Sequence, residues 1–444
     1  MSFLNCIIEG EGGYSAQGRQ THEVRLHPHF ATLGARAFCP DDGICRLGVV
    51  VDDFAAIYYD FHAFGVDLDA KEHIGAILET LHAKVGHRVE PGDQPVIAYF
   101  TGRSRLFSAN APFGRVSAGH RVSYGTGGPG GVRISNAVMT NLEFDPPTTF
   151  EQAIENLEPV YAFLHLIAGR RQNLTRIDLE LDAPKNRPDL NNLQVYWSSP
   201  PNRPIVAGER GPSPTDLPLN GGIQPTEFAE LLERWLAVHH ERRDARLQFS
   251  DGFSKGDRYD YGRLVSSANM FDILPASAVP KDVDLPKDLQ AARTEARRLF
   301  RALPQSIERD SVLGALGRLR TANLKHKARH RGQIVLAAAP GHFPDLILVL
   351  EEAINCRNHY VHGTPANIDY RGNNFFETVP FFTDTLEFVF AASDLIEAGW
   401  KIKPWLEAPT AMSHPFGSYR VSYNERLRAL KARFEAAASG AEGT

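Results

Sequence analysis

A stretch rich in proline and glycine, residues 198–222, separates two halves of the sequence that have different hydrophobic periodicities. Before it, apolar residues alternate with polar ones or form short β-branched runs, which is typical of strands. After it, apolar residues recur every three or four positions, as they do on amphipathic helices. Proline and glycine interrupt both kinds of element, so the stretch is either a linker or an extended crossing segment. The sequence therefore predicts an α+β protein, with a β-rich N-terminal domain followed by an all-α helical bundle.

The expected domain boundaries follow from this change of pattern. We place the β-rich domain at residues 1–205 and the linker at residues 206–222. A helical domain follows at residues 223–408, and residues 409–444 form a C-terminal helix and a flexible tail. With 444 residues and a hydrophobic fraction of 43%, the chain can form two or three domains with ordinary cores.

Local patterns predict the individual elements. Pro159 lies inside one predicted helix and should kink or split it. In the N-terminal half, strands are expected at residues 46–51, 55–61, 96–100, 121–124, 132–135, 175–182 and 193–197, and helices at residues 71–83 and 150–169. In the C-terminal half, helices are expected at residues 224–240, 261–274, 287–303, 343–362, 381–400 and 424–437, with one or two more within residues 306–331.

The composition indicates a cytoplasmic protein. Its four cysteines lack the spacing of a metal site or of a disulfide framework, as expected in a reducing compartment. We expect neither a signal peptide nor a membrane span, because no long apolar run is present. The formal net charge is −5, so the protein as a whole does not attract nucleic acid, and any binding of nucleic acid requires a local basic patch.

The most informative polar residues lie at the end of the predicted helix at residues 343–362. Arg357 is followed directly by Asn358 and, four positions after the asparagine, by His362. Gly363 comes next, where a left-handed residue commonly ends a helix. A guanidinium group matches phosphate oxygens, and histidine exchanges protons near neutral pH. Since RNA carries its own nucleophile, the 2'-hydroxyl, this pair supplies what RNA cleavage still needs without a metal ion, and the asparagine orients either group.

Two other interpretations of these residues are open. In the first, Arg357 and His362 have only structural roles, in a surface ion pair or as a helix-end cap. In the second, His362 binds zinc together with Cys356 and His359. Zinc ligands must lie within about 2.3 Å of one ion, whereas six residues along a helix span about 9 Å. We therefore expect no metal site and assign His359 as an accessory polar group.

A basic run without any acidic residue precedes this helix. It occupies residues 318–331 and is either a solvated surface or a track for phosphate groups. Because the run stands close in sequence to the Arg357 helix, we favour RNA binding. Its arginines and lysines are Arg318, Arg320, Lys325, Lys327, Arg329 and Arg331.

Two further patterns have ordinary structural explanations. Residues 125–130 read G-x-G-x-x-G, but a β-branched stretch follows instead of the helix that a dinucleotide site requires, so a hairpin connection is expected. Asp178, Glu180 and Asp182 share one face of a predicted strand. They form either a cation site or, as we favour, a solvated strand face.

The Arg-Asn-x-x-x-His pattern at a helix end, in a helical C-terminal half, resembles the HEPN ribonuclease superfamily. The β-rich half before it resembles the ApeA-like subfamily of prokaryotic defence proteins. This resemblance implies a metal-independent endoribonuclease that needs no cofactor. His362 would act as general base or acid, Arg357 would stabilise the charge that develops on the phosphate, and Asn358 would hold the geometry.

The resemblance also implies a biological role. HEPN domains pair, so we expect a homodimer with a composite site. The enzyme would act as a toxin in antiphage defence by abortive infection, cleaving host RNA, with tRNA as a candidate substrate. The N-terminal domain would sense a phage-derived trigger or restrain the nuclease. The alternative is a HEPN-like protein that binds nucleotides or RNA, or serves in dimerisation, without catalysis.

Overall fold

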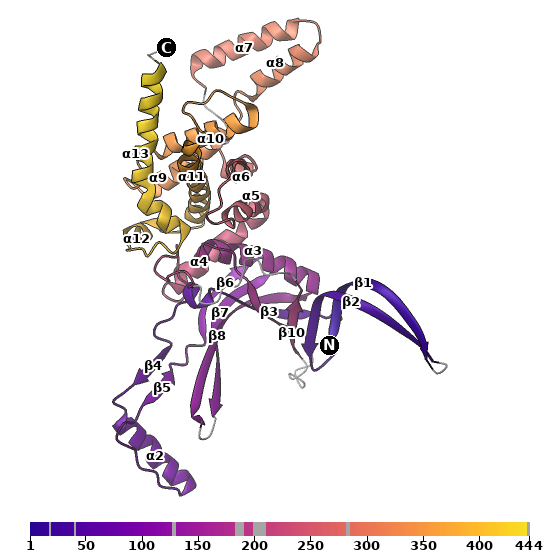
Figure 1. Ribbon diagram of the computed structural model, residues 1–444, viewed down its shortest axis with the longest axis vertical. Coiled ribbons are helices and arrows are strands. Elements are labelled where there is room, and N and C mark those ends of the chain that lie inside the picture. Colours follow the sequence, from indigo (N-terminus) through magenta and orange to yellow (C-terminus); the bar gives the residue numbers. More distant parts are fainter. Residues whose placement is uncertain are drawn as a thin grey trace.

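The computed structural model describes residues 1–16, 19–39, 41–126, 130–182, 191–198, 210–280 and 285–441. Its N-terminal half is built on an antiparallel sheet and its C-terminal half on helices, as Figure 1 shows. The predicted α+β fold class is therefore confirmed.

The main sheet has eight strands in the order β1-β2-β10-β9-β3-β8-β7-β6. Its central strand β3 runs antiparallel to both β9 and β8. In β9, Ile177 and Leu179 are buried while Asp178 and Glu180 lie on the opposite, wetter face, as the alternating pattern predicts. The strands are β1 Ser2–Ala16, β2 Arg19–Gly34, β3 Ile44–Val51, β4 Phe64–Asp67, β5 Ile97–Phe100, β6 Arg105–Ala111, β7 Gly114–Thr126, β8 Val132–Thr148, β9 Leu174–Leu181 and β10 Asn192–Trp197.

Helix α3 packs on the buried face of this sheet, and most other helices follow the crossing segment. Thr149 caps α3 by accepting a hydrogen bond from the Gln152 amide, and Pro159 lies within one continuous helix, so it does not split the element. The helices are α1 Phe54–Ile57, α2 Lys71–Val85, α3 Phe150–Ala168, α4 Pro225–Ala237, α5 His239–Phe253, α6 Tyr261–Asp272, α7 Lys287–Ala302, α8 Ile307–Arg318, α9 Leu324–Ala338, α10 Leu346–His362, α11 Asn373–Glu397, α12 Ile402–Glu407 and α13 Pro415–Ala441.

Several details differ from the sequence-based expectations, which did not include strands β1, β2, β4 and β6 and which began helix α11 at residue 381 instead of Asn373. Residues 55–61 do not form a strand: the short helix α1 and a turn bury Phe54 and Ile57 there, and a short apolar run cannot distinguish these arrangements. Helices α5 and α12 are additional. The C-terminal helix α13 begins and ends further out than residues 424–437, and residues 442–444 of the predicted tail lie outside the described part of the chain.

Over residues 210–222, the stretch rich in proline and glycine contains turns and bends and forms a crossing segment, whose Gly221 amide donates to the Ile57 carbonyl of the N-terminal half at 2.8 Å. Asp216 accepts hydrogen bonds from the amides of Ala411 and Ser413, at 2.8 and 2.7 Å. The Trp400 indole donates to the carbonyl of Pro218 at 2.8 Å. Residues 206–209 of the predicted linker are outside the described part. The segment therefore packs between the two halves, and one continuous hydrophobic core runs from the sheet into the helices.

Helices α6, α9, α10 and α11 pack against one another and form the centre of the C-terminal half. A buried ion pair joins two of them: Arg263 of α6 donates from Nε and Nη2 to the Glu387 carboxylate of α11, at 2.9 and 2.8 Å. Both side chains are 3% exposed. Breaking such a pair leaves a buried charge without its partner, which costs about 3–5 kcal/mol, so this contact fixes how α6 packs on α11.

Several elements extend away from these two packed halves (Figure 1). The β1–β2 hairpin and the β4–β5 pair with α2 extend from the sheet, and the α7–α8 hairpin extends from the helices at the far end of the molecule. The β7–β8 hairpin also extends, and it carries the expected G-x-G-x-x-G connection, of which residues 127–129 are not described. Among the described helices, none is long and apolar enough to cross a membrane.

Candidate active site

Helix α10 carries the Arg-Asn-x-x-x-His pattern. Val349 and Leu350 are fully buried and hold its first turns against the neighbouring helices. The helix ends as predicted, because Gly363 adopts the left-handed conformation (φ 67°) and its amide donates to the His359 carbonyl at 3.0 Å. The polar residues therefore lie on the last two turns, near solvent.

Arg357 is half-buried and connects the other residues of the site. Its Nη1 donates to Oδ1 of Asn358 at 3.0 Å and lies 3.1 Å from Nε2 of His362. Its Nη2 donates to Oδ1 of Asn269 in α6 at 2.8 Å. Its Nε is buried and has no hydrogen-bond partner within the described chain. The helix end thus brings Arg357, Asn358 and His362 into direct contact, and α6 adds a fourth polar residue.

The hydrogen bond between Arg357 and His362 defines which imidazole nitrogen is free of a proton. A guanidinium group only donates hydrogen bonds, so Nε2 of His362 accepts, and the neutral ring carries its proton on Nδ1. The ring is exposed to solvent. An anion that displaced His362 from the guanidinium would leave Nε2 free to accept a proton, as a general base does.

Asn269 is a site residue that the sequence did not reveal. It lies 88 positions before Arg357 along the chain, and no motif connects the two. Its neighbours Ala268 and Met270 are fully buried, so α6 is held in place while the amide reaches towards α10. Only the packing of α6 on α10 reveals the contact.

The loop after α10 is fixed by Glu352, a buried carboxylate on the same helix. Glu352 accepts hydrogen bonds from the Tyr370 hydroxyl at 2.5 Å and from the Asn367 amide at 2.8 Å. His359 donates from Nδ1 to the carbonyl of Thr364 in this loop, at 2.8 Å. Glu352 stands three positions after the buried Val349 and next to the buried Ala353, and an acid at such a position is the sequence signal that could have revealed it.

The zinc interpretation finds no support in the geometry. Cys356 is fully buried, on the side of α10 that faces the core. Burial, together with the nearby Glu352 carboxylate, raises the pKa of the Cys356 thiol well above its usual range. Within the described residues, no three His, Cys, Asp or Glu side chains are grouped closely enough to hold a metal ion. The acidic face of β9 was the other candidate cation site. There, the Asp178 carboxylate forms an ion pair with the Arg121 guanidinium at 2.5 Å.

One residue of the basic run lies in the core. Arg331 is 0% exposed, donates from Nε to the Ser393 hydroxyl at 2.8 Å, and pairs with Glu397 at 2.5 Å. Because its guanidinium stabilises the packing of α9 on α11, Arg331 is not accessible to RNA, and the sequence-based assignment of this residue to the phosphate track does not hold.

The other basic residues remain near the surface. Arg318 and Arg320 are exposed, Lys325 is half-buried, and Arg329 pairs with Glu351 at 2.5 Å. Lys327 is the one most directly connected to the site. Its Nζ lies 3.0 Å from the Asp272 carboxylate, one helical turn from Asn269 in α6. Lys327 and Arg357 are therefore held by adjacent turns of the same helix.

Three exposed apolar side chains lie on α10 and on the two helices packed against it, α6 and α11; we call Tyr261, Val361 and Phe376 the helix-end patch. Their side chains are 46%, 43% and 74% exposed. The ring of Tyr261 contacts that of Tyr360 in α10, with centroids 4.0 Å apart, and that of Phe375 at 4.7 Å. Tyr261 thus lies against the last turns of α10, while Phe376 is adjacent in sequence to the Phe375 that Tyr261 contacts.

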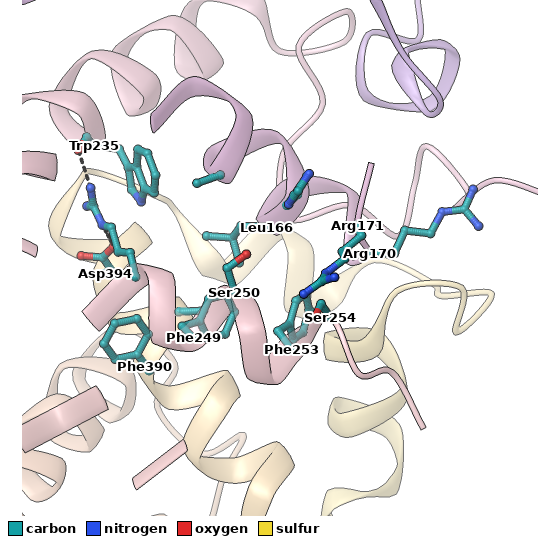
Figure 2. A pocket seen from close by; sticks show the side chains of 14 residues that line it. Leu166, Arg170, Arg171, Trp235, Phe249, Ser250, Phe253, Ser254, Phe390 and Asp394 are labelled. Carbon is teal, nitrogen blue, oxygen red and sulfur yellow. Dashed lines mark hydrogen bonds and ion pairs between the residues drawn. The ribbon is translucent and has the colours of Figure 1, made fainter. Parts of the chain in front are cut away.

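A separate small cavity lies between α3, α5 and α11, where the two halves meet (Figure 2). Its volume of about 20 Å³ has room for about one water molecule. Leu166, Trp235, Phe390 and Asp394 line it, and the guanidinium of Arg246 lies 3.7 Å above the Trp235 ring. None of the helix-end residues reaches this cavity, which belongs to the packing between the halves.

The protein is thus an α+β protein in which an antiparallel sheet is joined to a helical bundle, and an arginine and a histidine are in contact at an exposed helix end. Residues 1–235 match the family model described as ApeA N-terminal domain 1. The match spans more than half of the chain, so the chain belongs to this family, which places it among prokaryotic defence proteins. No curated protein and no solved structure matches the chain.

Proposed function

We propose that the protein is a metal-independent HEPN-type endoribonuclease that acts in antiphage defence. The observation that carries this proposal is the 3.1 Å contact between Nη1 of Arg357 and Nε2 of His362 at an exposed helix end. A phosphodiester bound there would lie against a cation and a proton acceptor at once. Membership of the ApeA family supports the defence role. Abortive infection by cleavage of host RNA, including tRNA, is part of the proposal.

The reaction begins when a substrate phosphate takes the place of His362 on Nη1 of Arg357. Nε2 then accepts the proton of the 2'-hydroxyl as this oxygen attacks phosphorus, and the bond from phosphorus to the 5'-oxygen breaks. The leaving oxygen takes its proton from water or from the histidine of a second copy. Arg357 stabilises the extra negative charge on the phosphate, and Asn269 and Asn358 hold the guanidinium in place.

A second copy of the chain completes the site in this proposal. A single Arg357 and His362 offer one proton carrier, whereas the two proton transfers need opposite protonation states. The helix-end patch supports pairing, because exposed apolar side chains rimmed by polar ones are typical of protein interfaces. Pairing through it would bring two α10 ends together around a two-fold axis.

Metal-independent RNA cleavage can be tested with one variant, His362→Ala, and one chelator, EDTA. The wild-type protein should cleave RNA in EDTA and leave a 2',3'-cyclic phosphate and a 5'-hydroxyl, because the nucleophile belongs to the substrate. His362→Ala should abolish cleavage while the free energy of unfolding changes by less than about 0.5 kcal/mol, since the ring is exposed. RNA with 2'-O-methyl groups should resist the wild-type protein.

Three results would contradict the proposal. They are cleavage by a folded His362→Ala variant at the wild-type rate, activity that EDTA removes and magnesium or zinc restores, and a 5'-phosphate on the product. RNA binding by a wild-type protein that never cleaves would favour the non-catalytic alternative.

A further inference from the structure

Basic residues are concentrated in one short part of this acidic protein. The chain has a net charge of −5, and four of its 53 acidic residues lie at residues 287–331, namely Asp288, Glu295, Glu308 and Asp310. Twelve of its 48 lysines and arginines lie in the same stretch. They are Lys287, Arg293, Arg297, Arg298, Arg301, Arg309, Arg318, Arg320, Lys325, Lys327, Arg329 and Arg331.

Most of this stretch forms the α7–α8 hairpin, which extends from the helical half of the protein (Figure 1). Neither helix has a buried residue, and α7 packs mainly against α8. A pair of helices without a core of its own gains little from apolar burial. The hairpin therefore presents its charges to solvent at the end of the molecule opposite the sheet.

Some of its cations have structural roles. Arg293 of α7 donates to the carbonyl of Leu316 at 2.6 Å, and Arg309 of α8 donates to the carbonyl of Phe300 at 3.0 Å. Each arginine thus satisfies the unpaired carbonyl end of the other helix, where a positive charge is favourable. These contacts account for the way the two helices are joined.

Three other cations have no such role. Arg297, Arg301 and Arg318 make no ion pair with any carboxylate of the described residues, and Nε of Arg297 is buried without a partner. Arg297 and Arg301 stand four positions apart on one helix face, where like charges destabilise the helix. A bound polyanion would remove this repulsion, because phosphate groups neutralise neighbouring guanidinium groups.

The basic surface continues from the hairpin to the candidate active site. α8 ends at Arg318, and α9 begins six residues later with Lys325 and Lys327 on its first turn. Lys327 contacts Asp272, on the turn of α6 next to Asn269 and hence to Arg357. Cations therefore lie along one route from the hairpin to Arg357.

We propose that the α7–α8 hairpin is an arm that binds the RNA backbone away from the cleavage site. The inference rests on the proposed ribonuclease function and extends it to substrate selection. RNA long enough to reach from Arg357 to the arm gains binding energy that a short oligonucleotide cannot obtain. Contacts of this kind are made to phosphates, so they depend on salt and not on base sequence.

The test compares two triple variants that change the net charge equally. The arm variant carries Arg297→Glu, Arg301→Glu and Arg318→Glu. The matched control carries Lys84→Glu, Arg88→Glu and Arg133→Glu, at exposed positions of the N-terminal half. Binding is measured over a range of salt concentrations with a long 2'-O-methyl RNA, which cannot be cleaved by 2'-hydroxyl attack. Cleavage is measured on a short oligonucleotide that contains only the scissile phosphate and its neighbours.

The arm variant should bind the long RNA on the order of tenfold more weakly, and the slope of log affinity against log salt should become shallower by roughly 2. It should cleave the short oligonucleotide as wild type does, and the control should bind the long RNA as wild type does. Changing the same three arginines to Gln should also weaken binding of the long RNA, but by a smaller factor. This milder variant is the control for misfolding of the Glu variant.

If the arm variant and the control lose affinity for the long RNA equally, the proposal is overturned, because the effect then depends only on net charge. Unchanged affinity of the arm variant would overturn it as well, and would leave an acidic protein surface as the ligand of the arm. If the wild-type protein binds long RNA through the arm but cleaves no RNA, the proposed ribonuclease activity is refuted while the RNA-binding role of the arm stands.

Discussion

Arg357 has an environment that a sequence pattern describes only in part. Its contacts with Asn358 and His362 follow from their places on one helix end, so the pattern was sufficient to predict that these three residues lie together. Its contact with Asn269 depends on another helix and was not predictable. Arg357 is half-buried, whereas His362 is exposed. A test of Arg357 must therefore allow for lost packing as well as lost chemistry.

Asn269 should act as a positioning residue for this guanidinium. Asn269→Ala removes one hydrogen bond and should lower the free energy of unfolding by about 1 kcal/mol. Displacement of Arg357 should lower the cleavage rate on the order of 10- to 100-fold. Asn269→Asp should retain stability through an ion pair, yet it should also lose activity, because a carboxylate competes with the substrate phosphate for Arg357.

The measurements are thermal unfolding and the single-turnover cleavage rate of each variant. A purely structural role would leave the stable Asn269→Asp variant fully active, and that result would refute the positioning role.

The helices show where hydrophobic periodicity succeeds and where it fails. α2, α6 and α7 begin at the predicted residues, because apolar spacing and the residues that precede them mark their starts. α5 was missed because its sequence is strongly charged. Two of its arginines, Arg242 and Arg246, are buried and pair with Asp394 of α11 at 2.5 and 2.8 Å. Arginine in a sequence indicates surface, and only its partner on a distant helix shows that it belongs to the core.

Helix α13 is joined to α3 by a histidine that must stay neutral. His414 donates from Nε2 to the carbonyl of Leu166 at 3.2 Å, and its Nδ1 accepts from the Phe416 amide at 3.1 Å. Burial lowers the pKa of His414 from 6.5 to about 4, and burial lowers that of His165 in α3 to about 4 as well. Between these values the unfolded chain binds protons that the folded chain does not.

The free energy of unfolding should therefore be highest above pH 6.5 and should fall as the pH is lowered towards about 4. Each histidine contributes on the order of 3 kcal/mol to this loss. His414→Gln, whose amide can both donate and accept, should remove about half of the pH dependence. Urea unfolding at several pH values measures the free energy of unfolding. If this free energy depends on pH in the variant as it does in the wild-type protein, His414 is not responsible.

The whole molecule is proposed to work as a pair, and the helix-end patch allows a direct test. Phe376→Glu replaces the most exposed side chain of the helix-end patch with a charged one. It should convert the protein from a dimer of twice 49.2 kDa into a monomer and should abolish most RNA cleavage. Ile77→Glu, on the exposed helix α2, is the matched control and should change neither property.

Light scattering reports the mass, and the cleavage assay reports the activity. A wild-type protein that is monomeric and fully active would show that one copy of Arg357 and His362 is sufficient.

The crossing segment at residues 210–222 also limits how such proteins are assembled in evolution. It contacts both halves: the side-chain amide of Asn220 donates to the Ala56 carbonyl, and the Trp405 indole donates to the carbonyl of Asp216. The family match continues through this segment to residue 235, inside α4. Exchange of gene segments at the apparent boundary would therefore leave these donors and acceptors without partners. A new effector joined to this sheet would have to inherit the segment and the first helix together, or rebuild the surface that they cover.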